Sequence, residues 1–221
     1  RTDMQTLRLL IPNFNPPKNF DKLGRIDFSG RFDGFFVDFV AYGELQSELG
    51  KATMDMRMDL RRGRDLAEYS GQLSLESFDL ARWADDDRLG KVTFRSEVKN
   101  GVGLTLETVD VKLGANIQSF TFKDYTYENL AIEGKFNQKL FDGKLNIKDD
   151  NIDLAFDGAL DFSDSIPLFN FRAQVNELDL KSLNLSKQNF VLAGKVDIEL
   201  RDKNFANMTG HIVANDLMLQ K

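Results

Sequence analysis

Strict alternation of apolar and polar residues recurs along almost all of this 221-residue chain, and it constrains the fold more than any other feature. The clearest stretch is NIDLAFDGALDF, residues 151–162. One phase of this stretch carries large apolar residues and a glycine, and the other carries aspartate and alanine. Successive side chains of a strand point to opposite faces of a sheet. We therefore predict a sheet with one apolar face and one acidic face.

Similar segments predict about fourteen strands, over residues 4–11, 22–32, 35–42, 51–61, 70–78, 90–99, 102–113, 117–123, 126–137, 140–148, 152–162, 168–178, 189–200 and 205–214. Connections such as NQKL, KDDN and SDSIP are short and rich in turn formers, which indicates antiparallel neighbours. No segment could hold a helical crossover, so a parallel α/β sheet is excluded. DLARWADDDR predicts one helical turn, with Asp79 as its N-cap, and the proline-containing stretch 12–20 reads as a linker.

Composition excludes several classes of function. The net charge of −6 provides no broad cationic surface, so nucleic acid is not an expected partner. The absence of cysteine excludes disulfides and thiolate metal sites, and we expect no metal and no cofactor. The basic stretch 61–64 is interpreted as a solvated turn. The most apolar run, FFVDFVAY, is interrupted by Asp38 and is too short to cross a bilayer.

A weak internal repeat of about one hundred residues organises the chain. FSGRF (28–32) aligns with IEGKF (132–136), and LESFDLARW (75–83) aligns with VNELDLKSL (175–183). The approximate repeats are 22–83 and 126–183, each consisting of four strands followed by a capped turn. Repeats of this kind stack into an array, so residues 1–221 are expected to form one elongated segment. The chain begins at Arg1 without a signal-peptide pattern, which suggests a piece of a longer protein.

Residues 120–186 resemble the AsmA-like and TamB-like proteins of Gram-negative envelopes. The sequence motifs on which the resemblance rests are YTYENL at 125–130, LFDGKL at 140–145 and LDLKSLNL at 178–185. In the first repeat, VDFVAY lacks the glycine of FDGKLN, and Trp83 stands where a leucine is found in the second repeat.

The resemblance implies an all-β fold: an elongated, antiparallel, repeating β-groove (β-taco) with one or two short helical turns. It implies a periplasmic location, in a parent protein anchored in the inner membrane by a segment absent from this piece. The implied function is to shield lipid acyl chains during phospholipid transport between inner and outer membranes, to aid outer-membrane protein assembly, or both. The implied partners are phospholipid acyl chains, an outer-membrane barrel of the Omp85 type and client outer-membrane protein strands.

The residues that we expect to line the groove are Phe136, Leu145, Ile147, Leu154, Phe156, Leu160, Phe162, Phe169 and Phe171. They would act together as a low-polarity surface. The residues alone leave a second interpretation open, in which the same face packs on a second sheet in a closed β-sandwich. Such a sandwich would be a structural or adhesive module of a cell-surface protein, without a lipid ligand.

Catalysis has little support in the sequence, and we do not expect an enzyme. The single histidine, His211, lies in the outward phase of its strand and has no evident partner. Asp153, Asp157 and Asp161 share one outward face, which is typical of a solvated surface. KDDNIDLAFDG contains enough oxygen ligands to bring a calcium site into consideration, but the spacing of these ligands is not that of a calcium-binding loop.

Overall fold

A computed structural model describes residues 2–10, 16, 18–105, 107–201 and 209–220 of the chain. Short helical elements are α1 (Met4–Leu10), η1 (Lys18–Leu23), η2 (Arg64–Leu66) and α2 (Leu80–Ala84). The strands are β1 (Asp27–Phe35), β2 (Asp38–Gln46), β3 (Lys51–Asp59), β4 (Glu68–Asp79), β5 (Leu89–Val102), β6 (Asp110–Phe122), β7 (Tyr125–Asn137), β8 (Leu140–Asp149), β9 (Ile152–Asp161), β10 (Leu168–Asp179), β11 (Val191–Arg201) and β12 (Thr209–Gln220).

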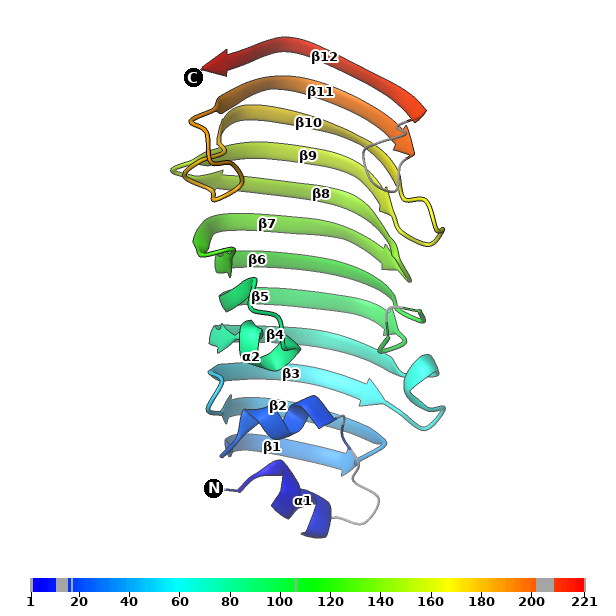
Figure 1. The fold of residues 1–221 in the computed structure, drawn as a ribbon. Helices are drawn as coiled ribbons and strands as arrows, with labels where there is room; N and C mark the ends of the chain where they lie inside the picture. Colours follow the sequence, from blue (N-terminus) through cyan, green and yellow to red (C-terminus); the bar gives the residue numbers. More distant parts are fainter. Residues whose placement is uncertain (1, 11–15, 17, 106, 202–208, 221) are drawn as a thin grey trace.

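All twelve strands form one antiparallel sheet, in which each strand pairs with its neighbours in the sequence (Figure 1). The sheet is open, with β1 and β12 at its two edges. The predicted all-β, elongated antiparallel architecture is confirmed. The β-sandwich alternative is wrong for the described residues, because they contain one sheet and no second sheet that could cover it.

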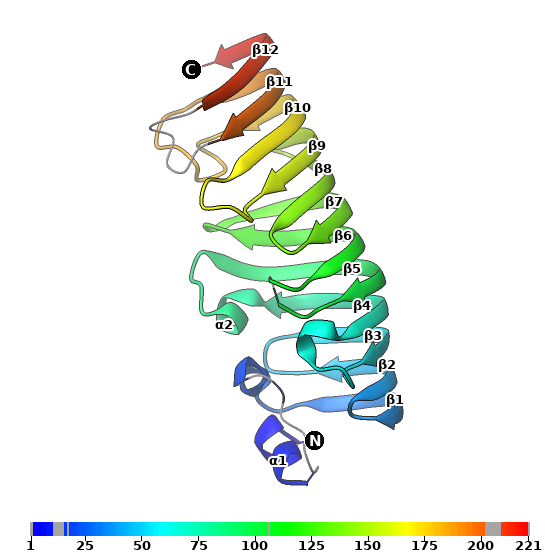
Figure 2. The ribbon, with the colours of Figure 1, turned by 90° about the vertical axis from the view of Figure 1, so that its right-hand side faces the viewer.

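The strands are bent, so the sheet forms a long trough whose open side is on the left of Figure 2. Helix α2 lies on this concave side, and α1 lies next to β1 at the N-terminal end of the trough. The apolar face of the sheet is the concave one, because Leu80 and Trp83 of α2 pack against Phe78 and Val92 of the sheet. The predicted alternation therefore separates an apolar inner face from a polar outer face.

The structure corrects some of the predicted strands. Residues 4–10 do not form a strand, because Asp3 accepts a hydrogen bond from the Thr6 amide at 2.7 Å and starts helix α1; residue 11 of the predicted strand 4–11 lies outside the described residues. Met4 and Leu7, which are three residues apart, then reach the same apolar cluster. The predicted strand 102–113 is mostly wrong, because residue 102 ends β5 and the described residues 103–105 and 107–109 form a connection. Its last part, residues 110–113, joins the predicted strand 117–123 in one strand, β6, since Gly114 continues the pairing without a break.

Other boundaries differ by a few residues. The stretch predicted as a strand from residue 22 begins with η1, and β1 starts at residue 27. Within the predicted linker 12–20, residues 12–15 and 17 lie outside the described residues, and residues 18–20 belong to η1. The predicted strand 205–214 lies partly outside the described residues, and β12 extends to residue 220.

Two capped turns stand at equivalent places, after β4 and after β10. The Asp79 side chain accepts a hydrogen bond from the Arg82 amide at 3.0 Å, which confirms the predicted N-cap of α2. Asp179 accepts from the Ser182 amide at 3.1 Å in the same way. Both turns direct an apolar side chain onto the inner face. Six strands separate the two turns, and the proposed internal repeat stays a prediction.

The turns complete two apolar clusters on the inner face. The first contains Phe78, Val92 and Leu49 and packs against Trp83 and Phe20. The second contains Leu130, Ile147 and Ile152, with the fully buried Leu183 contributed by the turn after β10. Both clusters lie toward the strand ends that carry these turns, so one arm of the trough is covered and the other arm is less covered.

Candidate functional site: the apolar inner face

One row of register partners crosses all twelve strands of the inner face. Its members, in strand order, are Gly30, Gly43, Met54, Leu73, Ser96, Ala115, Ile132, Leu145, Phe156, Ala173, Val196 and Ala214. Ser96 is the one polar member, and its hydroxyl donates to the Leu73 carbonyl at 3.0 Å. Eleven spacings of about 4.8 Å make this apolar row roughly 50 Å long.

Phenylalanine rings form a ladder that includes Phe156 of this row and otherwise lies beside it, on the less covered arm. The centroids of Phe136 and Phe141 are 4.8 Å apart, those of Phe141 and Phe156 are 6.4 Å apart, and those of Phe156 and Phe171 are 4.9 Å apart. A second group at the N-terminal end places Phe32 and Phe39 4.8 Å apart. Rings at these separations stabilise one another and present a continuous hydrocarbon surface.

Glycines of three neighbouring strands within this face leave no room for a side chain. Gly134 pairs with Gly143, and Gly143 pairs with Gly158. A Cβ on Gly143 would clash with the Glu133 carbonyl oxygen, and one on Gly158 would clash with that of Asn170. Gly158 also has a φ of +150°, which other residues rarely adopt. These positions therefore require glycine if the strands are to curve as they do.

The nine residues predicted to line the groove fall into three groups. Five lie on the inner face around the phenylalanine ladder and its neighbours: Phe136, Phe156, Leu160, Phe169 and Phe171. Three more lie on this face in the cluster that Leu183 covers: Ile147 is a buried member, and Leu145 and Leu154 pack against it. Phe162 follows the last residue of β9 and is 48% exposed, with its ring 5.8 Å from that of Phe169.

Some inner-face residues were missed in the sequence-based set. Phe141 is the clearest, because it links Phe136 to Phe156 in the ladder. Its place in the alternating phase of residues 141–147 was a sufficient signal to include it. Ala173 and Ile198 also share this face, but their neighbours in the sheet come from long-range pairing.

A polar network holds the covered arm in place. The Tyr125 hydroxyl donates to the Asp149 carboxylate and accepts from the Asn151 side-chain amide at 3.0 Å. Asp149 also accepts from the Glu128 amide at 2.9 Å. Partial burial, together with the adjacent carboxylate, raises the pKa of Tyr125 to about 12.

This network also bears on the calcium hypothesis. The Asp149 oxygens are engaged by Tyr125, Glu128 and the Asn151 amide, so they serve a structural role at the hairpin. Among the described residues, no group of three or more acidic or histidine side chains could hold a metal ion. His211 is exposed on β12, where its register partner is Glu199.

The basic stretch 61–64 lies at the turn between β3 and β4. Arg61 pairs with Asp59 at 2.5 Å and with Asp38 at 3.3 Å. Arg62 lies 3.7 Å from Glu68. These exposed arginines balance acidic residues of the neighbouring strands, which agrees with the interpretation as a solvated turn.

Comparison with known proteins adds no relative: no family model, curated protein or solved structure matches the chain. Within the described ranges, no helix is long and apolar enough to cross a membrane.

Proposed function

We propose that this chain is a section of a hydrophobic groove that shields lipid acyl chains during phospholipid transport between the inner and outer membranes. The groove works collectively, and no single residue performs chemistry. In this proposal the chain lies in the periplasm as part of a longer protein anchored in the inner membrane. The resemblance to AsmA-like and TamB-like proteins supports the location and an Omp85-type barrel as the partner.

The observation that carries the proposal is the long apolar row on the concave face of an open sheet. A single sheet has no second layer to cover this face, and the two turn clusters cover only one arm of it. The hydrocarbon core of a bilayer is about 30 Å thick, so one acyl chain spans roughly half of that. A row of roughly 50 Å can therefore contact several chain lengths in succession.

Replacement of Phe156 by aspartate tests the proposal. This change places a carboxylate in the middle of the phenylalanine ladder, where a bound acyl chain would have to desolvate it. Purified Phe156→Asp protein should extract less fluorescent phospholipid from vesicles and transfer less of it to acceptor vesicles.

Ala155→Asp is the matched control, because it adds the same charge one residue away on the exposed outer face. We expect this variant to bind and transfer lipid as the unmodified protein does. Thermal unfolding must show that both variants are folded. Equal lipid binding by a folded Phe156→Asp protein would contradict the proposal.

A further inference from the structure

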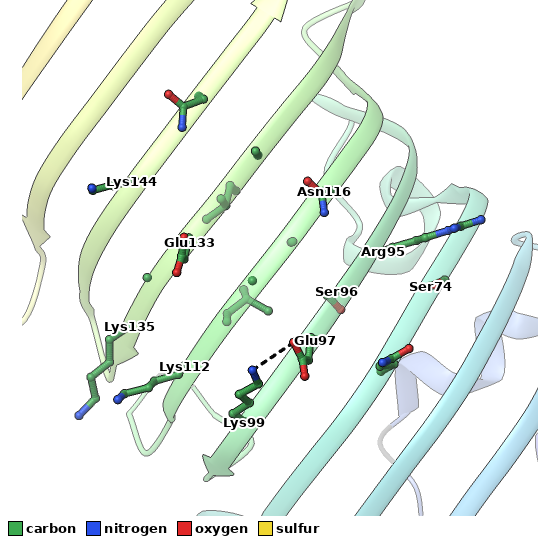
Figure 3. A pocket seen from close by; sticks show the side chains of 18 residues that line it. Ser74, Arg95, Ser96, Glu97, Lys99, Lys112, Asn116, Glu133, Lys135 and Lys144 are labelled. Carbon is green, nitrogen blue, oxygen red and sulfur yellow. Dashed lines mark ion pairs between the residues drawn. The ribbon is translucent and has the colours of Figure 1, made fainter.

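The outer face of the sheet carries a row of three lysines that lie directly opposite one another on adjacent strands. Lys99 of β5 pairs in register with Lys112 of β6, and Lys112 pairs with Lys135 of β7. Figure 3 shows the three side chains next to one another on these strands. Like charges in directly opposed positions destabilise a sheet.

The neighbouring row on the same face has the opposite arrangement. Its charges alternate in sign from strand to strand: Glu133, Lys144, Asp157, Arg172 and Asp197. Ion pairs form along it, with Lys144 at 3.7 Å from Asp157 and Arg172 at 3.1 Å from Asp197. The lysine row thus departs from the charge pairing used beside it.

In a row of acidic residues elsewhere on the outer face, every member has an ion-pair partner within the chain. Asp38, Asp59 and Glu68 are opposed in the same way, but Arg61 and Arg62 pair with them. In the lysine row the outer members have partners, since Lys99 is 3.3 Å from Glu97 and Lys135 is 3.0 Å from Asp110. Among the described residues, none forms an ion pair with the central Lys112.

The lysine row borders a hollow of about 790 Å³ in the outer face. Five cationic side chains line it against two acidic ones, although the whole chain has a net charge of −6. Gly114 also lines it, and a Cβ added there would meet no atom within 4 Å. Asn116 and Asn146 add amide groups that can donate hydrogen bonds. The volume lies in the range of small-molecule sites, about 300–1,000 Å³.

We propose that this hollow binds a small soluble molecule that carries two or more phosphate groups, held by Lys99, Lys112 and Lys135. Ammonium groups on adjacent strands can each donate several hydrogen bonds to phosphate oxygens. The bound anion would supply the negative charge that Lys112 lacks within the chain. The three lysines lie on the face opposite the apolar row, although Ser96, Ala115 and Ile132 of that row also line the hollow.

Sodium tripolyphosphate is the probe, titrated calorimetrically into the protein at about 0.01 M ionic strength, where screening is weak. Lys112→Gln should lower the affinity at least tenfold. Lys148→Gln is the matched control, because Lys148 is exposed on the same face outside the hollow and faces Asp153. This control should bind within twofold of the unmodified protein.

Thermal unfolding without the anion provides a second readout. Lys112→Gln should be at least as stable as the unmodified protein, because it relieves repulsion, and tripolyphosphate should raise the melting temperature much less in this variant. The absence of binding by the unmodified protein, or an equal loss in Lys112→Gln and Lys148→Gln, would overturn the proposal. Tighter binding of a polyglutamate peptide than of tripolyphosphate would overturn the phosphate class. Binding to phosphatidylglycerol vesicles without binding of tripolyphosphate would overturn the soluble ligand.

Discussion

Replacement of Leu183 by alanine measures how firmly the turn after β10 covers one arm of the trough. Leu183 has no exposed surface and packs with Leu130, Ile147 and Ile152. The substitution removes three buried carbon groups, worth roughly 2.4 kcal/mol at about 0.8 kcal/mol each. The cavity left behind adds to this loss, and such changes cost about 2–5 kcal/mol in total. We expect about 3 kcal/mol, in the lower part of this range, because a surface turn can partly collapse into the cavity.

Urea denaturation followed by circular dichroism gives this loss directly, and the melting temperature should fall by roughly 6–12 °C. Leu185→Ala is the control, since Leu185 lies two residues away in the same turn and is 48% exposed. It should cost less than about 1 kcal/mol. Equal losses in the two variants would refute the reasoning, because the turn would then not be held by the burial of Leu183.

Three further changes test other parts of the fold. Gly158→Ala should destabilise the protein by about 1–3 kcal/mol in urea denaturation, because the added Cβ would clash with a backbone oxygen. Gly114→Ala is the control and should change stability by less than about 0.5 kcal/mol, because a Cβ added there meets open space. A larger loss in Gly114→Ala than in Gly158→Ala would contradict the close approach of the curved strands at Gly158. Asp79→Ala should cost about 1 kcal/mol through loss of the N-cap, and no loss would show that α2 is held by packing alone. Hydrogen bonds from Arg61 lower the pKa of Asp59 from 3.8 to about 2, so this carboxylate binds fewer protons in the folded state than in the unfolded state. The ionised Asp59 should therefore stabilise the protein above about pH 4, and this stabilisation should be lost as the pH falls toward 2. In a plot of melting temperature against pH, Asp59→Asn should lack this loss.

Alternation was sufficient to predict the sheet and most of the side chains that share its inner face, because the period of two is a local property of each strand. In residues 152–161 it assigned every side chain to its face, and the register of β9 with β8 and β10 agrees with that assignment. It failed at residues 4–10, where Met4 and Leu7 satisfy a helical spacing as well and the Asp3 cap decides between the two.

Features that depend on which strands become neighbours were beyond sequence reasoning. Leu154 was predicted to line an open groove, yet it packs in the cluster that Leu183 covers from a turn 29 residues later in the sequence. The lysine row was also invisible, because Lys99, Lys112 and Lys135 become neighbours only through the register of three strands. Neither of these contacts can be recognised from the sequence of one segment alone.

The most direct test of the proposed groove is photo-crosslinking in cells, with benzoylphenylalanine at position 156 and, separately, at position 157. Position 156 lies in the phenylalanine ladder on the concave face, and Asp157 is exposed on the outer face of the same strand. Mass spectrometry should find phospholipid adducts at 156 and none at 157. Absence of lipid adducts at 156, or equal adducts at both positions, would contradict the proposal that the trough holds acyl chains.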